Sequence, residues 1–260
     1  MDPQTILETI CAAERSCAEL MLAAHDILTR DKGSVRNLVT QYDLKIQTLL
    51  TAHLSRVFPS AHFYCEESET PESLDAEEIF MIDPIDGTMN FVHALRQSCI
   101  SIAYLRDRTP VVGAVYNPYA DELFTAIRGE GARLNGSPIH VTDRGLAESL
   151  VAVGTAPYNP ELSDVTLRML RTALLNSLDI RRMGSAALDL CSVAAGRCGL
   201  FCEPLLSPWD YAAGALIAEE AGAVCRMLNG SPLPYDGSRP SVIAGGPNTV
   251  EDFFLLYNKS

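Results

Sequence analysis

Positive charge is scarce in this sequence. Its 260 residues include 20 lysines and arginines against 33 aspartates and glutamates, which gives a formal net charge of −13 at pH 7. Binding to DNA or RNA draws mainly on lysine and arginine side chains that neutralise phosphates. The composition therefore argues against a nucleic acid as the partner.

Long apolar runs are also missing. No segment approaches the roughly 20 apolar residues of a membrane-spanning helix, and the first residues, Met-Asp-Pro-Gln, have no basic region of the kind that opens a secretory signal. We expect no membrane association and a cytoplasmic location. With 47% hydrophobic residues, the chain can still bury a substantial core.

Several common site signatures are absent. The eight cysteines include no Cys-x-x-Cys pair, and most lie in apolar runs, which favours buried reduced thiols over disulfides or a zinc site. There is no Gly-x-Ser-x-Gly elbow and no Walker loop. The five histidines are scattered, so we assign structural roles to His93 and the others.

The most informative segment runs from a short apolar stretch, residues 79–82, into Asp-Pro-Ile-Asp-Gly-Thr. The apolar stretch is typical of a buried strand, and we expect a turn to begin at Asp83. Pro84 fixes one φ angle and Gly87 permits a reversal of the backbone, so that Asp83 and Asp86 face one point. Two unpaired carboxylates this close repel each other, and a divalent cation relieves the repulsion. Oxygen ligands favour magnesium, manganese or calcium over zinc.

An anion can bind beside these acids. Thr88 starts a segment, residues 89–96, that is compatible with a helix, so amide groups around Gly87 and Thr88 can point at a phosphate. One alternative is a surface turn in which Asp83 and Asp86 bond their own backbone, but a buried strand leads straight into the acids. Another is the haloacid dehalogenase motif Asp-x-Asp-Gly-Thr, from which the spacing here, Asp-x-x-Asp-Gly-Thr, differs by one residue.

Three further segments carry charges that mean little in isolation. Glu66 and Glu67 follow an apolar stretch, and because neighbours on a strand face opposite sides, at most one should reach a site. Asp210 stands at the start of a predicted helix, where an aspartate is usually an N-cap. Lys32 and Asp43 bracket a loop and the entry to a helix, where either could be surface charge.

Taken together, in this order and spacing, these segments resemble the inositol monophosphatase family of magnesium-dependent, lithium-sensitive sugar phosphatases. The resemblance covers nearly the whole chain. Its motifs are Leu-Val-Thr-x-x-Asp ending at Asp43, Glu-Glu-Ser from Glu66, Asp-Pro-Ile-Asp-Gly-Thr from Asp83, Asn-Phe-Val-His from Asn90 and Trp-Asp-x-Ala-Ala-Gly from Trp209. Departures are modest: Met89 replaces the more usual threonine, Phe-Met replaces Trp-Ile before the motif, and residues 69–78 form a short segment.

The resemblance implies how the acids share metal ions. Glu66, Asp83 and the Ile85 carbonyl would hold one magnesium ion, while Asp83, Asp86 and Asp210 would hold a second, with Asp83 bridging. Two or three ions would bind per site, manganese is a possible substitute, and lithium is an expected inhibitor.

It also implies the catalytic and substrate-binding groups. Thr88 and Asp43 would form a hydrogen-bonded pair that orients a metal-bound water for in-line attack, with Glu66 assisting and Lys32 steadying the loop. The matching substrate and phosphate contacts are Gly87, Thr88, Gly184, Ser185, Ala186 and Glu203. The implied reaction is hydrolysis of myo-inositol 1-phosphate without a covalent intermediate.

Other functions stay open at this point. Relatives with nearly the same metal motif act on fructose 1,6-bisphosphate, histidinol phosphate or phosphoadenosine phosphate. A non-catalytic metal-binding regulator would need a damaged site, and every acid that the family requires is present. The resemblance implies a small-molecule phosphate ester as the partner and a homodimer as the assembly.

The residue pattern predicts a mixed α+β or α/β fold. Apolar residues at three- and four-residue steps over residues 6–28 predict an amphipathic helix, and a second helix is expected from about residue 43 to 50. Residues 99–127 predict an antiparallel meander, with one more tight turn at 135–136.

The second half of the chain alternates strands and helices. Strands are expected at residues 150–153, 198–202 and 241–244, and helices within 160–178, at 186–195 and from 211 onward. We expect two tightly packed lobes, residues 1–146 and 147–260, because no flexible linker separates them. The resemblance implies a layered α/β/α/β/α sandwich with the metal site between the lobes.

Overall fold

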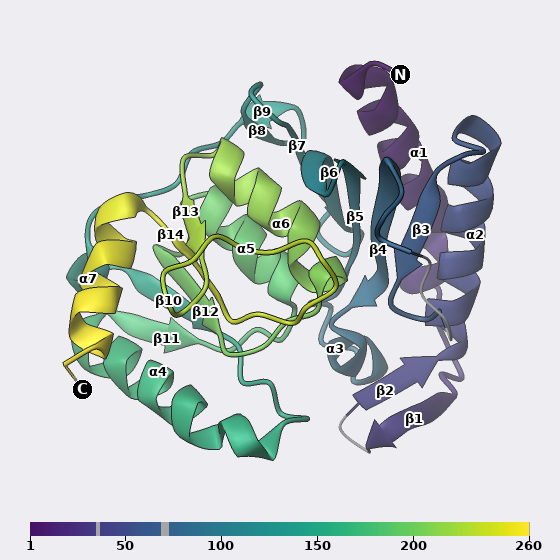
Figure 1. Cartoon of the computed structure of the whole chain (residues 1–260). Coiled ribbons are helices and arrows are strands. Elements are labelled where there is room, and N and C mark those ends of the chain that lie inside the picture. The colour runs from purple at the N-terminus through teal and green to yellow at the C-terminus, as the bar shows by residue number, and fades with distance from the viewer. Residues whose placement is uncertain (35–36, 69–72, 260) are drawn as a thin grey trace.

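The computed structural model describes residues 1–34, 37–68 and 73–259, and its elements form five layers in the order α/β/α/β/α (Figure 1). One outer layer consists of α1 (Pro3–Leu22) and α2 (Gln41–Val57), the central layer of α5 (Ala186–Ala194) and α6 (Pro208–Glu220), and the other outer layer of α4 (Ser163–Asn176) and α7 (Pro247–Tyr257). A sheet lies between each pair of helical layers. The layer order that the sequence resemblance implied is confirmed.

The large sheet has seven strands in the spatial order β3-β4-β5-β6-β7-β8-β9. Their bounds are β3 (His62–Cys65), β4 (Glu78–Asp86), β5 (Cys99–Arg106), β6 (Thr109–Asn117), β7 (Glu122–Ile127), β8 (Ala132–Leu134) and β9 (Ser137–Pro138). Strands β3 and β4 are parallel, and the other neighbouring pairs are antiparallel. The meander predicted from residue 99 onward is confirmed in β5, β6 and β7.

Alternation along β4 links the two halves of the core. Ile79 and Met81 pack toward the central helices, whereas Phe80 and Ile82 pack toward α1 and α2. Successive side chains of a strand point to opposite faces, so a sheet covered by helices on both sides needs an unbroken apolar run. Because the preceding residues of β4 have to be apolar, the acids at its end, Asp83 and Asp86, are easily recognised in the sequence.

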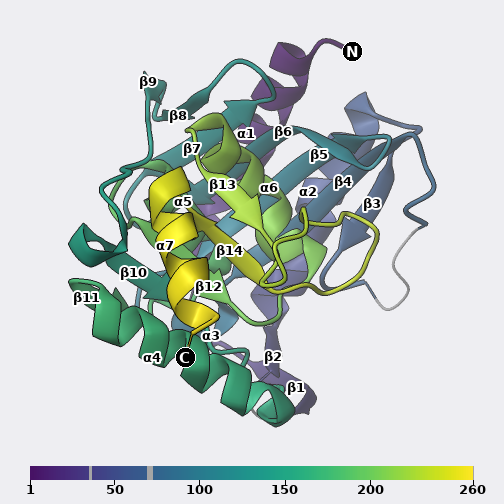
Figure 2. The same cartoon turned by 60° about the vertical axis from the view of Figure 1, so that its left-hand side comes forward.

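The small sheet has five strands in the spatial order β11-β10-β12-β14-β13. Their bounds are β10 (Leu150–Val153), β11 (Asp179–Arg181), β12 (Leu200–Glu203), β13 (Val224–Arg226) and β14 (Val242–Gly245). Strands β10, β11 and β12 run parallel, and β14 is antiparallel to β12 and β13. Helices α4 and α7 cover the outer face of this sheet (Figure 2), and Val151, Met169 and Phe253 belong to the apolar cluster between them.

Two helix predictions were wrong at their ends. Helix α1 stops at Leu22 rather than near residue 28, because the backbone leaves the helical conformation at the C-cap Ala23 (ψ 9°). The positive φ of Asp26, 47°, prevents the helix from resuming, so the later apolar periodicity comes from a loop. Helix α3 (Thr88–Val92) is shorter than the predicted 89–96, because Ala94 and Arg96 also have positive φ angles. In the opposite direction, α2 runs on to Val57, well beyond the predicted residue 50.

Some elements were not predicted. The segment before Asp43 forms a hairpin of β1 (Thr29–Ser34) and β2 (Asn37–Thr40) where a loop was expected, and α7, β11 and β13 were missed. Two short 3-10 turns, Leu146–Glu148 and Pro160–Leu162, complete the element order. Residues 35–36 and 69–72, which fall in the predicted loop and in the short segment after Ser68, lie outside the described residues.

The predicted boundary between two lobes falls in the first of these short turns, Leu146–Glu148. The core between the two sheets is continuous across that point, since α5 and α6 pack on the large sheet as well as on the small one. The division into two lobes therefore stays a prediction. No helix in the described part of the chain has the length and apolar character needed to cross a membrane.

Small residues set how closely α6 approaches its neighbours. A Cβ on Gly214 would lie 2.8 Å from Leu190 Cβ on α5, and a Cβ on Gly113 of β6 would lie 3.0 Å from the Ala213 carbonyl oxygen. These contacts leave no room for a methyl group. Because Asp210 lies in the first turn of α6, this close packing also fixes where that carboxylate stands.

The packing of α6 gives the first prediction. Gly214→Val should lower the free energy of unfolding by roughly 1–3 kcal/mol, because the added methyl groups have to displace Leu190 and with it α5. Urea unfolding followed by circular dichroism measures the change. The matched control Ala52→Val adds bulk to an exposed position on α2 and should cost at most about 0.7 kcal/mol through helix propensity. Equal losses in the two variants would contradict the tight contact.

Candidate functional site

An irregularity in β4 brings Asp83 and Asp86 to the same side of the strand. Asp83 pairs with Ser101 and Asp86 pairs with Cys99, so three steps along β4 match two steps along β5. In a regular strand, residues three apart face opposite sides; one extra residue in a bulge removes that opposition. Both carboxylates line one cavity as a result. The turn expected after Asp83 is thus displaced: β4 continues to Asp86, and the chain reverses at Gly87, which has a φ of 85°.

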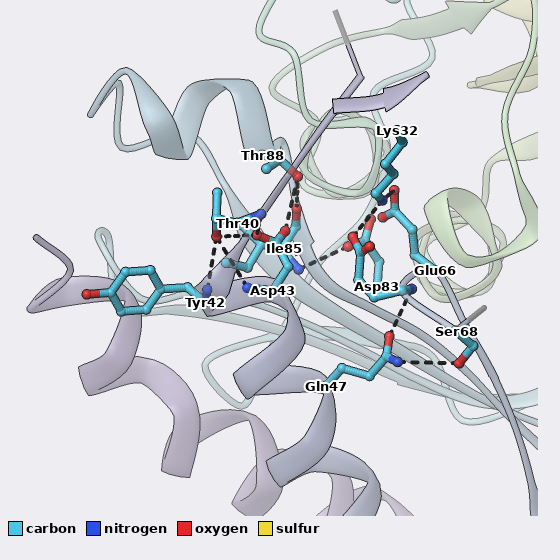
Figure 3. Close-up of polar contacts among 11 residues, drawn as sticks. Lys32, Thr40, Tyr42, Asp43, Gln47, Glu66, Ser68, Asp83, Ile85 and Thr88 are labelled. Carbon is cyan, nitrogen blue, oxygen red and sulfur yellow. Dashed lines mark hydrogen bonds and ion pairs between the residues drawn. The ribbon is translucent and has the colours of Figure 1, made fainter. Parts of the chain in front are cut away.

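Three carboxylates from separate elements converge beside this bulge. Glu66 directly follows β3, Asp83 lies in β4, and Asp210 lies in the first turn of α6. One oxygen of each lies within 4.8 Å of the others. Glu66 and Asp83 reach the same place because β3 and β4 are parallel neighbours, whose carboxyl ends meet at one edge of the sheet. Figure 3 shows these two side chains facing each other.

Burial and mutual repulsion dominate the electrostatics of this cluster. Burial raises the pKa of Asp83 well above its usual range, and the nearby Glu66, Asp86 and Asp210 carboxylates raise it further. The pKa of Asp210 is raised well above its usual range for the same reasons, with Glu66 as its strongest charged neighbour. This donor set is partly buried and offers only oxygen ligands, so it fits a hard divalent cation such as magnesium.

Lys32 supplies positive charge at the edge of the cluster. Its ammonium Nζ lies 2.9 Å from Glu66 Oε1 (Figure 3) and 2.6 Å from Glu67 Oε1. Burial alone would lower the pKa of Lys32, but the two glutamates outweigh it and raise that pKa. Of the two glutamates, Glu66 lines the cavity. The backbone amide of Glu67 donates to Gln47 Oε1 at 2.9 Å. Burial raises the pKa of Glu67 to about 7.

Asp43 joins the start of α2 to Thr88. It stands three residues after the N-cap Thr40, whose backbone amide donates to Asp43 Oδ2 at 2.9 Å. The other carboxylate oxygen, Oδ1, accepts from the Thr88 hydroxyl at 3.2 Å, and the Ile85 carbonyl oxygen lies 3.1 Å from the same hydroxyl (Figure 3). Burial raises the pKa of Asp43 to about 6, although its hydrogen bonds with Thr40 oppose the rise.

Asp86 is held by the start of α5. Its Oδ2 accepts from the Ser185 hydroxyl and from the Ala187 amide, the latter at 2.8 Å. Burial raises the pKa of Asp86 to about 6, and these two bonds limit the rise. Gly87 is required next to it, because a Cβ there would lie 2.9 Å from the Gln97 carbonyl oxygen and its φ of 85° suits only glycine well.

Glu203 faces the same cavity from the end of β12. Its Oε1 accepts from the Ala156 amide at 3.1 Å, and burial raises its pKa to about 7. Gly154 makes room for this carboxylate, since a Cβ there would lie 2.0 Å from the carboxylate carbon. The cavity has a volume of about 570 Å³. Every predicted site residue lines it except Asp43, which lies behind Thr88.

Sequence reasoning missed several cavity residues: Asn90, Tyr158, Arg182, Asp189, Trp209 and Arg239 line it as well. Asp189 had a usable signal, because it is the one charged side chain in the otherwise apolar helix α5. Arg182 had no such signal, because it is the second of two adjacent arginines in a polar stretch and fits no motif. In the structure its Nε lies 3.3 Å from the Thr155 hydroxyl.

Comparison with known proteins identifies the arrangement. The model of the inositol monophosphatase family matches residues 2–255. The chain belongs to this family. Members of the inositol monophosphatase family are metal-dependent phosphatases, so the chain is a phosphoric monoester hydrolase.

Individual relatives agree with the family match. The chain is 41% identical over 237 residues to the tomato (Solanum lycopersicum) protein "Inositol monophosphatase 2", covering 88% of each chain. It is 36% identical over 256 residues to a "Putative Nus factor SuhB" of Neisseria meningitidis, covering 96% of this chain and 97% of the other. Among solved structures it is similar to an "IMPase/NADP phosphatase complexed with Mg2+ and phosphate", with a TM-score of 0.88, 26% identity and coverage of 99% and 96%.

The burial of Glu203 gives a prediction about pH. Its pKa rises from 4.5 to about 7 on folding, so between these values the folded protein keeps a proton that the unfolded chain has lost, and stability falls as pH rises. Without metal ions, the free energy of unfolding should drop from pH 5 to pH 8, and Glu203→Gln should reduce that drop by roughly 1–3 kcal/mol.

Urea unfolding in a chelator, repeated at four pH values, measures the drop. The control Glu130→Gln removes an exposed carboxylate from the turn between β7 and β8 and should leave the pH profile as in the unmodified protein. A Glu203→Gln profile parallel to that of the unmodified protein would show that Glu203 is not a source of the pH dependence.

Proposed function

We propose that this phosphatase hydrolyses myo-inositol 1-phosphate to myo-inositol and phosphate with the help of magnesium ions. The observation that carries the proposal is the convergence of Glu66, Asp83 and Asp210 within 4.8 Å in a cavity that Thr88 and Glu203 also line. The tomato relative, an inositol monophosphatase, supports the substrate, and the structural relative, which is complexed with magnesium and phosphate, supports the metal.

The metal ligands follow from the family resemblance and suit the positions of the acids. Glu66, Asp83 and the Ile85 carbonyl would hold one ion, and Asp83, Asp86 and Asp210 would hold a second, with Asp83 shared between them. When bound, magnesium neutralises charge on the phosphoryl oxygens and raises the acidity of a water molecule. We assign two or three magnesium ions to the site, with manganese as a substitute and lithium as an inhibitor.

Thr88 and Asp43 orient the attacking water in this proposal. The Thr88 hydroxyl has a single proton and two acceptors, Asp43 Oδ1 at 3.2 Å and the Ile85 carbonyl at 3.1 Å. When that proton is donated to Asp43, the Thr88 oxygen accepts a hydrogen bond from a water in the cavity, and a lone pair of the water is left for phosphorus. As the water oxygen bonds to phosphorus, the bond between phosphorus and the inositol oxygen breaks, the water proton passes to Thr88 and the Thr88 proton passes to Asp43. The leaving inositol oxygen takes a proton from a second water molecule, so that inositol and phosphate are released.

The remaining groups hold the reactants. Lys32 keeps Glu66 in place through the 2.9 Å contact, and Glu66 assists the orientation of the water. Backbone amides at Gly87 and Thr88 suit the phosphoryl oxygens. Gly184, Ser185 and Ala186 contact the substrate at the start of α5, and Glu203 accepts hydrogen bonds from its hydroxyl groups. Together these contacts use binding energy to hold the water in line with the ester bond that breaks.

Two alternatives are kept. Fructose 1,6-bisphosphate, histidinol phosphate and phosphoadenosine phosphate are other substrates for the same metal chemistry. A non-catalytic regulator is the alternative from another class, and the name of the Neisseria relative, a putative Nus factor, points in that direction; the complete set of acids and Thr88 argues for turnover instead. By family resemblance we also propose a homodimer. From the sequence pattern we propose a cytoplasmic location and two lobes, residues 1–146 and 147–260.

The metal assignment gives a prediction about turnover. Asp83→Asn should reduce phosphate release from inositol 1-phosphate below detection at ordinary magnesium concentration, because it removes charge from the ligand proposed to bridge two ions. His93→Asn should keep most of the activity, since His93 does not line the cavity. Colorimetric phosphate release, with and without magnesium, measures both variants.

Folding is checked separately by circular dichroism and the thermal midpoint. A folded Asp83→Asn enzyme with near-normal kcat would rule out the bridging role. Activity of the unmodified enzyme that survives exhaustive chelation would remove the metal dependence altogether.

Glu203 gives a prediction about substrate choice. Glu203→Gln should lower kcat/KM for inositol 1-phosphate by roughly 10- to 100-fold, the scale of a hydrogen bond to a charged group at about 1.5–3 kcal/mol. β-Glycerophosphate, which lacks the ring hydroxyls, should lose much less. Steady-state kinetics on both esters measures the difference, after a panel of phosphate esters on the unmodified enzyme. Equal losses would mean that Glu203 supports the fold rather than contacts the sugar.

A further inference from the structure

Asp189 on α5 is a buried acid that the mechanism above does not use. Its side chain is 2% exposed, yet it lines the same cavity as the metal ligands. Its Oδ1 has no hydrogen-bond partner in the described part of the chain. Native proteins leave few buried polar atoms unpaired, because each one has lost its hydrogen bonds to water. The residue lines the cavity while this oxygen itself is covered, so a small rotation of the carboxyl group would offer it to a ligand in the cavity.

The position of Asp189 indicates what that ligand is. It lies one helical turn after Ser185, and its amide donates to the Ser185 carbonyl at 3.0 Å, so both side chains point from the same face of α5. Among the charged groups, the Glu203 carboxylate raises the pKa of Asp189 most, followed by Asp86, whereas the Arg182 guanidinium lowers it. Asp189 lines the same cavity as Glu203, the residue proposed to bind the sugar hydroxyls.

Hydroxyl groups suit this position better than other ligands. Burial raises the pKa of Asp189 well above its usual range, and the Glu203 carboxylate adds to the rise. Both effects favour the neutral carboxylic acid, which donates as well as accepts hydrogen bonds. A second phosphate would be repelled by the Glu203 and Asp86 charges. An apolar group would leave the acid unpaired. A neutral hydroxyl avoids both penalties.

We propose that Asp189 is a specificity-determining residue that hydrogen-bonds a hydroxyl of the substrate other than the one bound by Glu203. The enzyme then selects phosphate esters of polyols that carry several hydroxyls over esters with one or none. This inference rests on the proposed function, because it concerns the alcohol part of the same phosphate ester.

The test compares two substrates of the same ring size. Asp189→Ala should lower kcat/KM for inositol 1-phosphate by roughly 3- to 10-fold, mainly through KM, because one hydrogen bond between neutral groups is lost. Cyclohexyl phosphate, which has no ring hydroxyls, should change by less than about twofold. Asp189→Asn keeps a donor and an acceptor and should recover part of the loss. The control Asp107→Asn makes the same chemical change in the exposed turn between β5 and β6 and should leave both substrates unaffected.

Monodeoxy analogues of inositol 1-phosphate identify the contact. For one analogue, Asp189→Ala should cause no further loss, and a different analogue should behave this way for Glu203→Gln. If both variants become insensitive to the same missing hydroxyl, the assignment of separate contacts is wrong.

Two more readouts separate this role from others. The thermal midpoint of Asp189→Ala should not fall, since the removed Oδ1 has no partner in the described chain, and the magnesium concentration for half-maximal activity should stay unchanged. A lower midpoint or a shifted magnesium dependence, with equal losses on both substrates, would overturn the inference and leave the proposed function intact. An unmodified enzyme that releases phosphate from neither ester would overturn the proposed function, and this inference with it.

Discussion

Repulsion between carboxylates confined to a small buried volume is the constraint on which the rest of this structure depends. Two unit charges separated by 4.8 Å, the limit that encloses the Glu66, Asp83 and Asp210 oxygens, repel by roughly 3–4 kcal/mol at an effective dielectric of about 20. A chain gains nothing in stability from such an arrangement. The acids stay together because strands and helices of the core hold them, and each of those elements is stabilised by apolar packing elsewhere.

Helix starts reduce the repulsion without removing it. Asp43 accepts from the Thr40 amide at the start of α2, Asp86 from the Ala187 amide at the start of α5, and Asp210 from the Ser207 amide at 2.7 Å at the start of α6. The positive end of a helix dipole stabilises a carboxylate by roughly 0.3–1 kcal/mol. That is smaller than one pairwise repulsion, so the helices position the acids and leave the larger part of the charge for cations to neutralise.

The residues of the site could be predicted from the sequence, but part of their arrangement in space could not. Asp83, Asp86 and Thr88 fall in one contiguous motif after an apolar strand, and Asp210 follows the single tryptophan, so short-range pattern was enough to find them. The bulge between Asp83 and Asp86 was not predictable, because a bulge is defined by pairing with β5, which the local sequence does not encode.

The fold shows the same division between local and long-range information. The strands of the meander alternate or run apolar over their whole length, and their pattern predicted them. The end of α1 and the hairpin of β1 and β2 depend on individual backbone conformations, such as the positive φ of Asp26, that residue type alone does not specify. Asp189 could have been singled out as the one charged side chain of α5, but that it faces the cavity was evident only from the structure.

Gly154 has a consequence for how substrate preference can change in this lineage. The space that its missing side chain leaves is occupied by the Glu203 carboxylate, since a Cβ at that position would lie 2.0 Å from the carboxylate carbon. Any larger residue at position 154 has to be accompanied by a shorter one at position 203, and a shorter residue at 203 alone leaves a void. The two positions are therefore expected to vary as a pair among relatives. A change of substrate class that involves this part of the cavity then needs both substitutions, because either one alone leaves a clash or a void.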